Sequence, residues 1–265
     1  MTPAFEVNGI DVFAEGEGAE TIVMIHGWPD TYRLWDAQVA FFRDRYRCVR
    51  FTLPGFDVAR PRRAYSLAET LTILKDIVER AAGGRKAILM LHDWGCAFGY
   101  QFAMRHPELV SRIVGVDIGD AGTREHVRSL GTRAKAMVFA YQIWLAIAWR
   151  IGGALGDRMT LAMARMARAP SDPRFVDSRM NYPYYIRWMK AYGSYRDMVR
   201  FEPSVPMFFA YGKRKPFLFH TPEWADALAA RPGNLVRAFP TGHWVMSQQP
   251  EQFNEVVGGW LAAAR

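Results

Sequence analysis

The sequence predicts an α/β fold: a mostly parallel, doubly wound sheet with a helical lid inserted in it. Four continuous apolar runs are typical of strands buried on both faces of a parallel sheet, namely Thr21–Ile25, Ala87–Leu91, Ile113–Val116 and Val205–Tyr211. Helical stretches alternate with several of these runs, which indicates helices on both faces of the sheet. A long aromatic, arginine-rich stretch separates the last two of them.

Two further strands are expected at Arg47–Leu53 and Leu235–Phe239. The predicted core helices are Asp30–Phe42, Ser66–Ala81, Ala97–His106 and Thr221–Ala230. Ser66 and Glu69 have the spacing of a capping box, and Pro222 occupies a first helical position, so both helix starts are marked in the sequence.

The interruption divides the chain into a core of residues 1–120 and 204–265 and a helical lid of residues 121–203. Within the lid, Ala136–Trp149 is nearly all apolar but shorter than the roughly 20 residues that cross a bilayer. We therefore expect a buried lid helix here rather than a membrane anchor.

Composition excludes several classes of protein. With 265 residues, 50% of them hydrophobic, the chain can bury a sizeable core, so disorder is excluded as the main state. Cys48 and Cys96 are too few for a disulfide framework and lack the spacing of a metal knuckle. No metal and no cofactor is predicted. The acidic N-terminal stretch does not resemble a secretory signal, so a soluble, cytoplasmic protein is expected.

The net charge of +8 comes mainly from the lid, because residues 124–200 contain 14 Arg or Lys against 5 Asp or Glu. Such a bias can attract acidic membranes or nucleic acid. The basic residues are scattered rather than consecutive, which favours a solvated face, and no nucleic-acid partner is expected.

The motif with the most chemical content is Leu91–Gly95, which reads Leu-His-Asp-Trp-Gly and lies between a buried strand and a helix. A tight strand-to-helix turn of this kind presents one side chain at the edge of the sheet, as in a nucleophile elbow. Here that side chain is Asp93, and no Gly-x-Ser-x-Gly occurs in the chain, so a carboxylate nucleophile is predicted. The structural alternative is an aspartate that only caps the helix.

Two further motifs complete a catalytic set. His26–Pro29 follows the first long strand, where backbone N–H groups of Trp28 and Trp94 could hold a developing oxyanion, with His26 in a structural role. His243, in Gly-His-Trp after the last strand, has the position of a general base.

Together these motifs resemble the epoxide hydrolase and haloalkane dehalogenase branch of the α/β-hydrolase superfamily, over nearly the whole chain. The resemblance implies an α/β-hydrolase fold and Asp93 in an H-D-W-G elbow, and the H-G-W-P and G-H-W motifs match epoxide hydrolases. It also implies two lid tyrosines that bind the epoxide oxygen. Tyr141 in Phe-Ala-Tyr-Gln and Tyr195 in Tyr-Arg-Asp-Met match their contexts, with Tyr182, Tyr184 and Tyr185 in reserve.

Three departures keep alternatives open. Leu91 replaces the usual glycine, and residues 95–99 are closer to a dehalogenase elbow, in which Trp94 would bind the halide. Lys215 stands where the triad acid is usually found, and lysine cannot orient an imidazolium. Asp117 or, less favoured, Asp120 at the end of the preceding strand is the expected substitute, because a carboxylate there needs a partner.

The predicted function is hydrolysis of a small apolar epoxide by water, through an Asp93 ester, by a monomer or homodimer. The pocket is expected to contain lid aromatics: Phe139, Trp144, Trp149, Tyr185 and Trp188. A haloalkane dehalogenase using Asp93 and His243 is the first alternative. The second is a non-catalytic protein that binds an apolar ligand or a membrane surface.

Overall fold

The computed structural model describes residues 2–263, in which eight strands form one sheet in the order β1-β2-β4-β3-β5-β6-β7-β8. All strand pairs from β4 to β8 are parallel, while β2 pairs antiparallel with β1 and with β4. The strands are β1 (Phe5–Val7), β2 (Ile10–Glu15), β3 (Thr21–Ile25), β4 (Arg47–Phe51), β5 (Ala87–His92), β6 (Val110–Val116), β7 (Met207–Gly212) and β8 (Leu235–Phe239). The six predicted strands are confirmed, and the N-terminal hairpin was not predicted.

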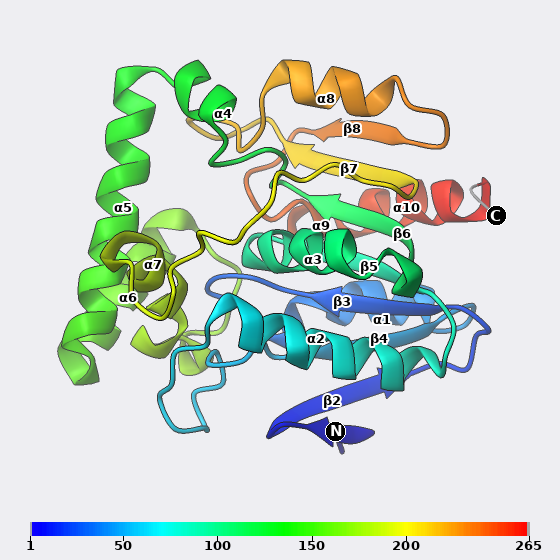
Figure 1. Ribbon diagram of the computed structural model, residues 1–265, viewed down its shortest axis with the longest axis horizontal. Coiled ribbons are helices and arrows are strands. Elements are labelled where there is room, and N and C mark those ends of the chain that lie inside the picture. Colours follow the sequence, from blue (N-terminus) through cyan, green and yellow to red (C-terminus); the bar gives the residue numbers. More distant parts are fainter. Residues whose placement is uncertain (1, 264–265) are drawn as a thin grey trace.

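Helices cover both faces of the sheet, which confirms the predicted doubly wound α/β class (Figure 1). One face carries α2 (Leu67–Ala82), α3 (Trp94–Arg105) and α8 (Pro222–Ala229); the other carries α1 (Asp36–Phe42), α9 (Val245–Gln248) and α10 (Pro250–Ala263). Each face buries its own hydrophobic cluster against the sheet, and this burial is the main source of stability for such a fold.

The predicted helix starts are also confirmed. The Ser66 side chain accepts a hydrogen bond from the backbone N–H of Glu69, whose carboxylate in turn accepts the Ser66 N–H. Thr221 caps α8 just before Pro222. The α3 helix begins three residues earlier than expected, at Trp94, so Asp93 is the last residue before it.

Four helices stand between β6 and β7, beyond the carboxyl edge of the sheet (Figure 1). They are α4 (Arg124–Ser129), α5 (Thr132–Ile151), α6 (Gly153–Ala167) and α7 (Tyr182–Met189). Short 3-10 turns lie at Tyr32–Trp35 before α1, at Pro107–Leu109 between α3 and β6, and at Pro173–Phe175 and Ser178–Asn181 between α6 and α7.

The expectation that the apolar lid helix is buried was wrong. In α5 only Leu145, Ala146 and Ala148 are buried, whereas five of its large apolar side chains are 38–52% exposed. A nearly all-apolar helix is expected to be buried on every side. A single helix packed on a core buries only one side, so the apolar residues on its other side stay exposed. Among residues 2–263, no helix combines the length and apolar character needed to cross a membrane.

Candidate active site

Asp93 lies in a strained turn between β5 and α3. Its φ is 52° and its ψ is −121°, a backbone conformation that a residue other than glycine rarely adopts. The turn presses against the loop after β3, where a Cβ on Gly27 would lie 2.4 Å from an Asp93 carboxylate oxygen. The sharp turn and the glycine together hold the Asp93 carboxylate at the carboxyl edge of the sheet.

The Asp93 carboxylate has a partner on each oxygen. Oδ1 accepts the backbone N–H of Trp28 at 2.7 Å, and Oδ2 lies 3.4 Å from Nε2 of His243. Burial would raise the pKa of Asp93, but the hydrogen bond and charge of His243 outweigh it and lower the pKa. Asp93 is therefore ionised at neutral pH, as a nucleophile requires.

His243 follows β8 and bridges two carboxylates. Its Nδ1 lies 2.5 Å from Oδ2 of Asp117, opposite the side that faces Asp93. Burial alone would lower the pKa of His243, yet the charge and hydrogen bond of Asp117, with those of Asp93, raise it to about 9. An imidazole held between two carboxylates is fixed in orientation and can move a proton at Nε2.

Asp117 occupies the turn directly after β6, with a φ of 70°. Its Oδ1 accepts the backbone N–H of Gly212 at 2.9 Å and forms an ion pair with Nζ of Lys215. The Lys215 side chain is only 8% exposed, and its charge, ahead of that of His243, reverses the effect of burial and lowers the pKa of Asp117. Lys215, at the position where an acid was expected, thus contacts Asp117, the predicted triad acid.

Asp120 is placed differently. Its carboxylate accepts the backbone N–H of Thr221 at 2.7 Å and the Thr221 hydroxyl at 2.9 Å. These contacts fix the start of α8 rather than an imidazole. Of the two candidates for the triad acid, the structure brings Asp117 to His243.

A second layer of polar residues, which the sequence analysis missed, supports His243. His92 donates from Nε2 to the His243 carbonyl at 3.2 Å, and Asp30 accepts the indole N–H of Trp244 at 2.9 Å. Burial raises the pKa of Asp30 to about 7 and lowers that of His92 to about 3. Their positions directly after Pro29 and directly before Asp93 were the available signal.

His26 has the structural role that was expected. Its ring is fully buried, accepts the Leu53 N–H at Nε2 (2.8 Å) and donates from Nδ1 to the Gly27 carbonyl (2.9 Å). Burial lowers the pKa of His26 to about 4, so the ring is neutral and joins two loops.

A cavity of about 910 Å³ lies between the core and the lid. Asp93 and His243 line it from the core, together with Trp28 and Trp244, while Tyr141 and Tyr184 line it from the lid. The rest of the lid side is largely apolar: Met137, Ala140, Trp144, Ala162, Met163, Met166 and Ala167. Such a cavity suits a mostly apolar ligand with one polar group.

The two predicted lid tyrosines are not equivalent. Tyr141 lines the cavity, and its hydroxyl accepts a hydrogen bond from Gln142 at 3.0 Å. Tyr195 does not line it: its ring packs on Trp94 and Phe98. The second tyrosine of the cavity is Tyr184, one of the reserve candidates, whose ring lies edge-on to Tyr141 and Trp94. The sequence favoured Tyr195 over Tyr184, whereas the structure places Tyr184 on the cavity, because short tyrosine contexts do not show which ring faces inward.

Of the five predicted pocket aromatics, the structure places only Trp144 on the cavity. Phe139 is 52% exposed and packs edge-on against Trp188, whose indole N–H is bound by Gln142. Trp149 packs at a tilt against Tyr185, and the guanidinium of Arg62 lies over its ring. These four are packing residues of the lid, a correction to the prediction.

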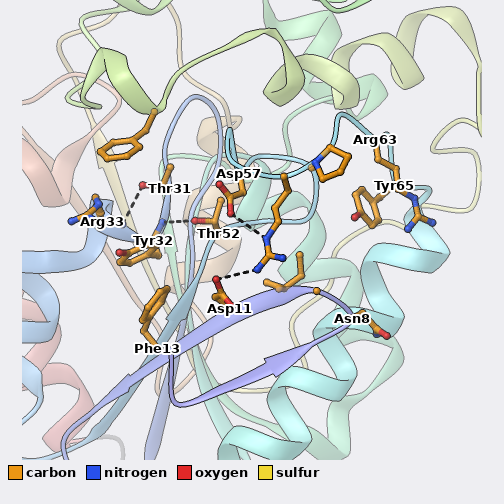
Figure 2. A pocket seen from close by; sticks show the side chains of 16 residues that line it. Asn8, Asp11, Phe13, Thr31, Tyr32, Arg33, Thr52, Asp57, Arg63 and Tyr65 are labelled. Carbon is orange, nitrogen blue, oxygen red and sulfur yellow. Dashed lines mark hydrogen bonds and ion pairs between the residues drawn. The ribbon is translucent and has the colours of Figure 1, made fainter. Parts of the chain in front are cut away.

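A second hollow of about 390 Å³ lies between the N-terminal hairpin and the loops after β3 and β4 (Figure 2). Arg60 contacts Asp11 and Asp57, and Arg63 contacts Glu69 outside it, while the guanidinium of Arg33 lies over the rings of Tyr32 and Phe175. It contains no residue of the catalytic set. Within residues 2–263, no cluster of three His, Cys, Asp or Glu side chains could hold a metal ion, and both cysteines are buried and free.

Comparison with known proteins identifies the family of this chain. Residues 22–256 match the family model described as the alpha/beta hydrolase family. This chain therefore belongs to the alpha/beta hydrolase family, and the resemblance found in the sequence is confirmed.

Among curated relatives, epoxide hydrolase 1 of Caenorhabditis elegans is 33% identical over 105 residues, which are 38% of this chain and 26% of the relative. Epoxide hydrolase 4 of Homo sapiens is 32% identical over 108 residues, 39% of this chain and 30% of the relative. The matched part of this chain thus spans less than a third of these relatives.

Solved structures are similar over almost the whole chain. A Bacillus megaterium epoxide hydrolase in complex with an inhibitor has a TM-score of 0.72 at 19% identity, covering 97% of this chain and 99% of that one. A loop variant of a haloalkane dehalogenase from Bradyrhizobium elkanii has a TM-score of 0.68 at 17% identity, covering 98% and 95%. These likenesses show the α/β-hydrolase fold.

Proposed function

We propose that this chain hydrolyses epoxides to vicinal diols through an ester of Asp93. The observation that carries the proposal is that the nucleophile Asp93, the base His243 and the hydroxyl-bearing side chains of Tyr141 and Tyr184 all line one cavity. The names of the curated relatives support the same reaction.

In the first step, a carboxylate oxygen of Asp93 attacks one epoxide carbon and the carbon–oxygen bond of the ring breaks. The emerging alkoxide takes a proton from Tyr141 or Tyr184. Burial raises the pKa of Tyr141 to about 12 and holds that of Tyr184 well above its usual value, so both phenols keep their protons at neutral pH. The tyrosine recovers its proton from solvent.

Ester formation also prepares the second step. It removes the Asp93 charge that helps to raise the pKa of His243, so the imidazolium releases its proton to solvent. His243 then takes a proton from water, and the hydroxide attacks the ester carbonyl carbon. The backbone N–H of Trp28, with that of Trp94, holds the oxyanion.

Collapse of the tetrahedral intermediate expels the alcohol oxygen of the diol. The proton of the newly formed carboxylic acid passes to that oxygen, which restores ionised Asp93 beside protonated His243. The protons therefore balance over the cycle, and the net reaction consumes one epoxide and one water.

Haloalkane dehalogenation is the second candidate, because residues 95–99 favour a dehalogenase elbow and its first step needs the same nucleophile. That reaction requires N–H donors for the departing halide. The indole N–H of Trp28 is directed at Asn181, to which it donates at 2.7 Å. Because this N–H is occupied by Asn181, Trp28 does not offer Trp94 a second N–H donor for a halide. The missing second donor supports the epoxide reaction.

The test compares diol formation from styrene oxide with bromide release from a bromoalkane. Tyr141→Phe and Tyr184→Phe should each slow epoxide opening by about ten- to a hundredfold, since each loses an alkoxide donor. Tyr195→Phe is the matched control and should retain the parent rate, because its ring lies off the cavity. Bromide release without diol formation, or a defect confined to Tyr195→Phe, would reject the proposal.

A further inference from the structure

The lid carries an exposed apolar surface. Met137, Ala140, Trp144, Ile147 and Ile151 follow one another at intervals of three and four residues, so they share one side of α5. All five are solvent-exposed. The adjoining helix α6 adds three more exposed apolar positions, seven and four residues apart and so also on one side of the helix: Leu155, Ala162 and Met166. These eight residues are called the α5–α6 face below.

Exposed apolar side chains are concentrated in the lid. Within residues 2–263, eleven of the twelve large hydrophobic side chains that are exposed lie between Val127 and Val199, and the exception is Leu235. A scattered pattern would need no explanation, but a contiguous patch on one pair of helices marks an interaction surface.

Cationic side chains border the α5–α6 face. Arg133 extends the α5 stripe by one turn, and Arg158 and Arg165, seven residues apart, lie along one side of α6. All three are exposed, and none forms an ion pair within the described residues. The only acidic residue of α5 and α6 is Asp157, which is occupied by the backbone N–H and hydroxyl of Ser178.

The α5–α6 face shares residues with the active-site cavity. Met137, Ala140, Trp144, Ala162 and Met166 belong both to the exposed face and to the lining of the cavity that contains Asp93. A molecule that covers the α5–α6 face therefore also contacts this part of the cavity lining.

We propose that the α5–α6 face docks on an anionic lipid surface, so that lipophilic substrates pass from the lipid directly into the cavity. Apolar side chains on one side of a helix, flanked by arginines, are the pattern of segments that lie in the plane of a membrane interface. The arginines would bind lipid phosphates while the apolar stripes reach the acyl chains. The proposed docking is argued only from the residues of the α5–α6 face. The delivery of an epoxide also rests on the proposed function.

A second copy of the chain is a poorer occupant of this face. In a two-fold dimer the same patch contacts itself, which would bring the arginines of both copies together. The face offers no free carboxylate to neutralise them, and like charges opposed at an interface oppose binding. An anionic surface satisfies both the apolar stripes and the arginines.

The test is flotation of the full chain with vesicles of phosphatidylcholine alone and with about a third phosphatidylserine. Binding should require phosphatidylserine. Arg158→Glu with Arg165→Glu should reduce the bound fraction at least about tenfold, and Ile151→Gln with Leu155→Gln should reduce it to a similar extent. The matched control, Arg85→Glu with Arg237→Glu, reverses two exposed arginines of the core and should bind like the parent.

The inactive variant Asp93→Asn keeps this test separate from the chemistry, because it should still bind the vesicles. For an epoxide carried in the vesicles, the surface variants should raise KM, while a short water-soluble epoxide should be turned over at the parent rate. Equal flotation of the surface and control variants would overturn the proposal. So would a dimer in gel filtration that Ile151→Gln with Leu155→Gln dissociates, since a second copy would then cover the face.

Discussion

Charged side chains of the active site in the core are buried and paired, whereas those beside the apolar face of the lid are exposed and form no ion pair within the described residues. In the core, Asp93, His243, Asp117 and Lys215 form one connected, largely buried group in which each charge has an opposite charge beside it. On α5 and α6, the arginines beside the apolar face are exposed and form no ion pair within the described residues.

This difference predicts which charged residues affect the proposed reaction and which affect only binding to a surface. Removing one charge of a buried, connected group leaves its partner buried and uncompensated, which is costly and changes the pKa of the neighbours. Removing an exposed charge changes little, because water already solvates it. Substitutions in the core group should therefore affect the reaction steps, and substitutions among exposed lid charges should not.

The largest effect is expected at the nucleophile. Asp93→Ala should lower turnover at least about ten-thousandfold while the fold survives, since no other carboxylate can form the ester. His243→Gln should block only the second step, so that a substrate adduct accumulates on the peptide containing Asp93 and is visible by mass spectrometry. Lys135→Gln, which removes an exposed lid charge, is the control and should have the parent rate.

A single turnover in ¹⁸O water, with enzyme in excess, examines the same step independently. Water that attacks the ester carbonyl leaves its label in Asp93, and the first product is largely unlabelled. Label in the first product, together with no adduct in His243→Gln, would mean that water attacks the substrate directly.

A smaller but still large effect is expected at the triad acid. Asp117→Asn should slow ester hydrolysis by about a hundred- to ten-thousandfold, because it removes the charge that orients His243 and stabilises its protonated form. Asp120→Asn is the matched control: it weakens contacts to Thr221 and should reduce stability by about 1 kcal/mol with little change in rate. Single-turnover hydrolysis measures the two rates, and thermal unfolding measures the two stabilities. A larger loss of rate in Asp120→Asn than in Asp117→Asn would move the triad acid to Asp120.

The core could be predicted from the sequence because its signals are local. The run Ala87–Leu91 is continuously apolar and forms most of β5, and Ser66 marks a helix start within four residues. The strands β1 and β2 were missed because they form an antiparallel hairpin at the edge of the sheet, where one is short and both are only partly buried. The exposure of α5 was missed for a related reason: hydrophobicity does not tell whether a helix is covered.

The candidate catalytic residues divide along the same line. Asp93 and His243 lie in local motifs that predict their place at the carboxyl edge of the sheet, and the structure brings Oδ2 of Asp93 and Nε2 of His243 to 3.4 Å. The ion pair of Lys215 with Asp117 joins positions 98 residues apart in the sequence, so no local pattern predicts it. The inward direction of Tyr184 depends on how α7 packs against α5, which a tyrosine context cannot encode.

The smallest predicted effect concerns Lys215, whose ammonium is paired with the carboxylate that orients His243. In the ester state, Asp93 has lost its charge. The titratable groups around His243 are then Asp117, with Lys215 behind it, the imidazole of His92 and, through its charge, Asp30, which Lys215→Met leaves in place. His92 is neutral, since burial lowers its pKa to about 3. Asp117 then favours the protonated form of His243, and the lysine opposes it.

Lys215→Met removes that opposing charge, so the pKa of His243 in the ester state should rise. The base form would then be present only at higher pH, and the acid limb of single-turnover ester hydrolysis should move up by about half to one unit. The rate at neutral pH should fall about three- to tenfold and recover fully at alkaline pH. Lys213→Met removes an exposed charge two residues away and should leave the limb in place. A loss of rate that is equal at every pH would show that Lys215 only holds the loop in shape, and a downward shift would contradict the electrostatic role assigned to it.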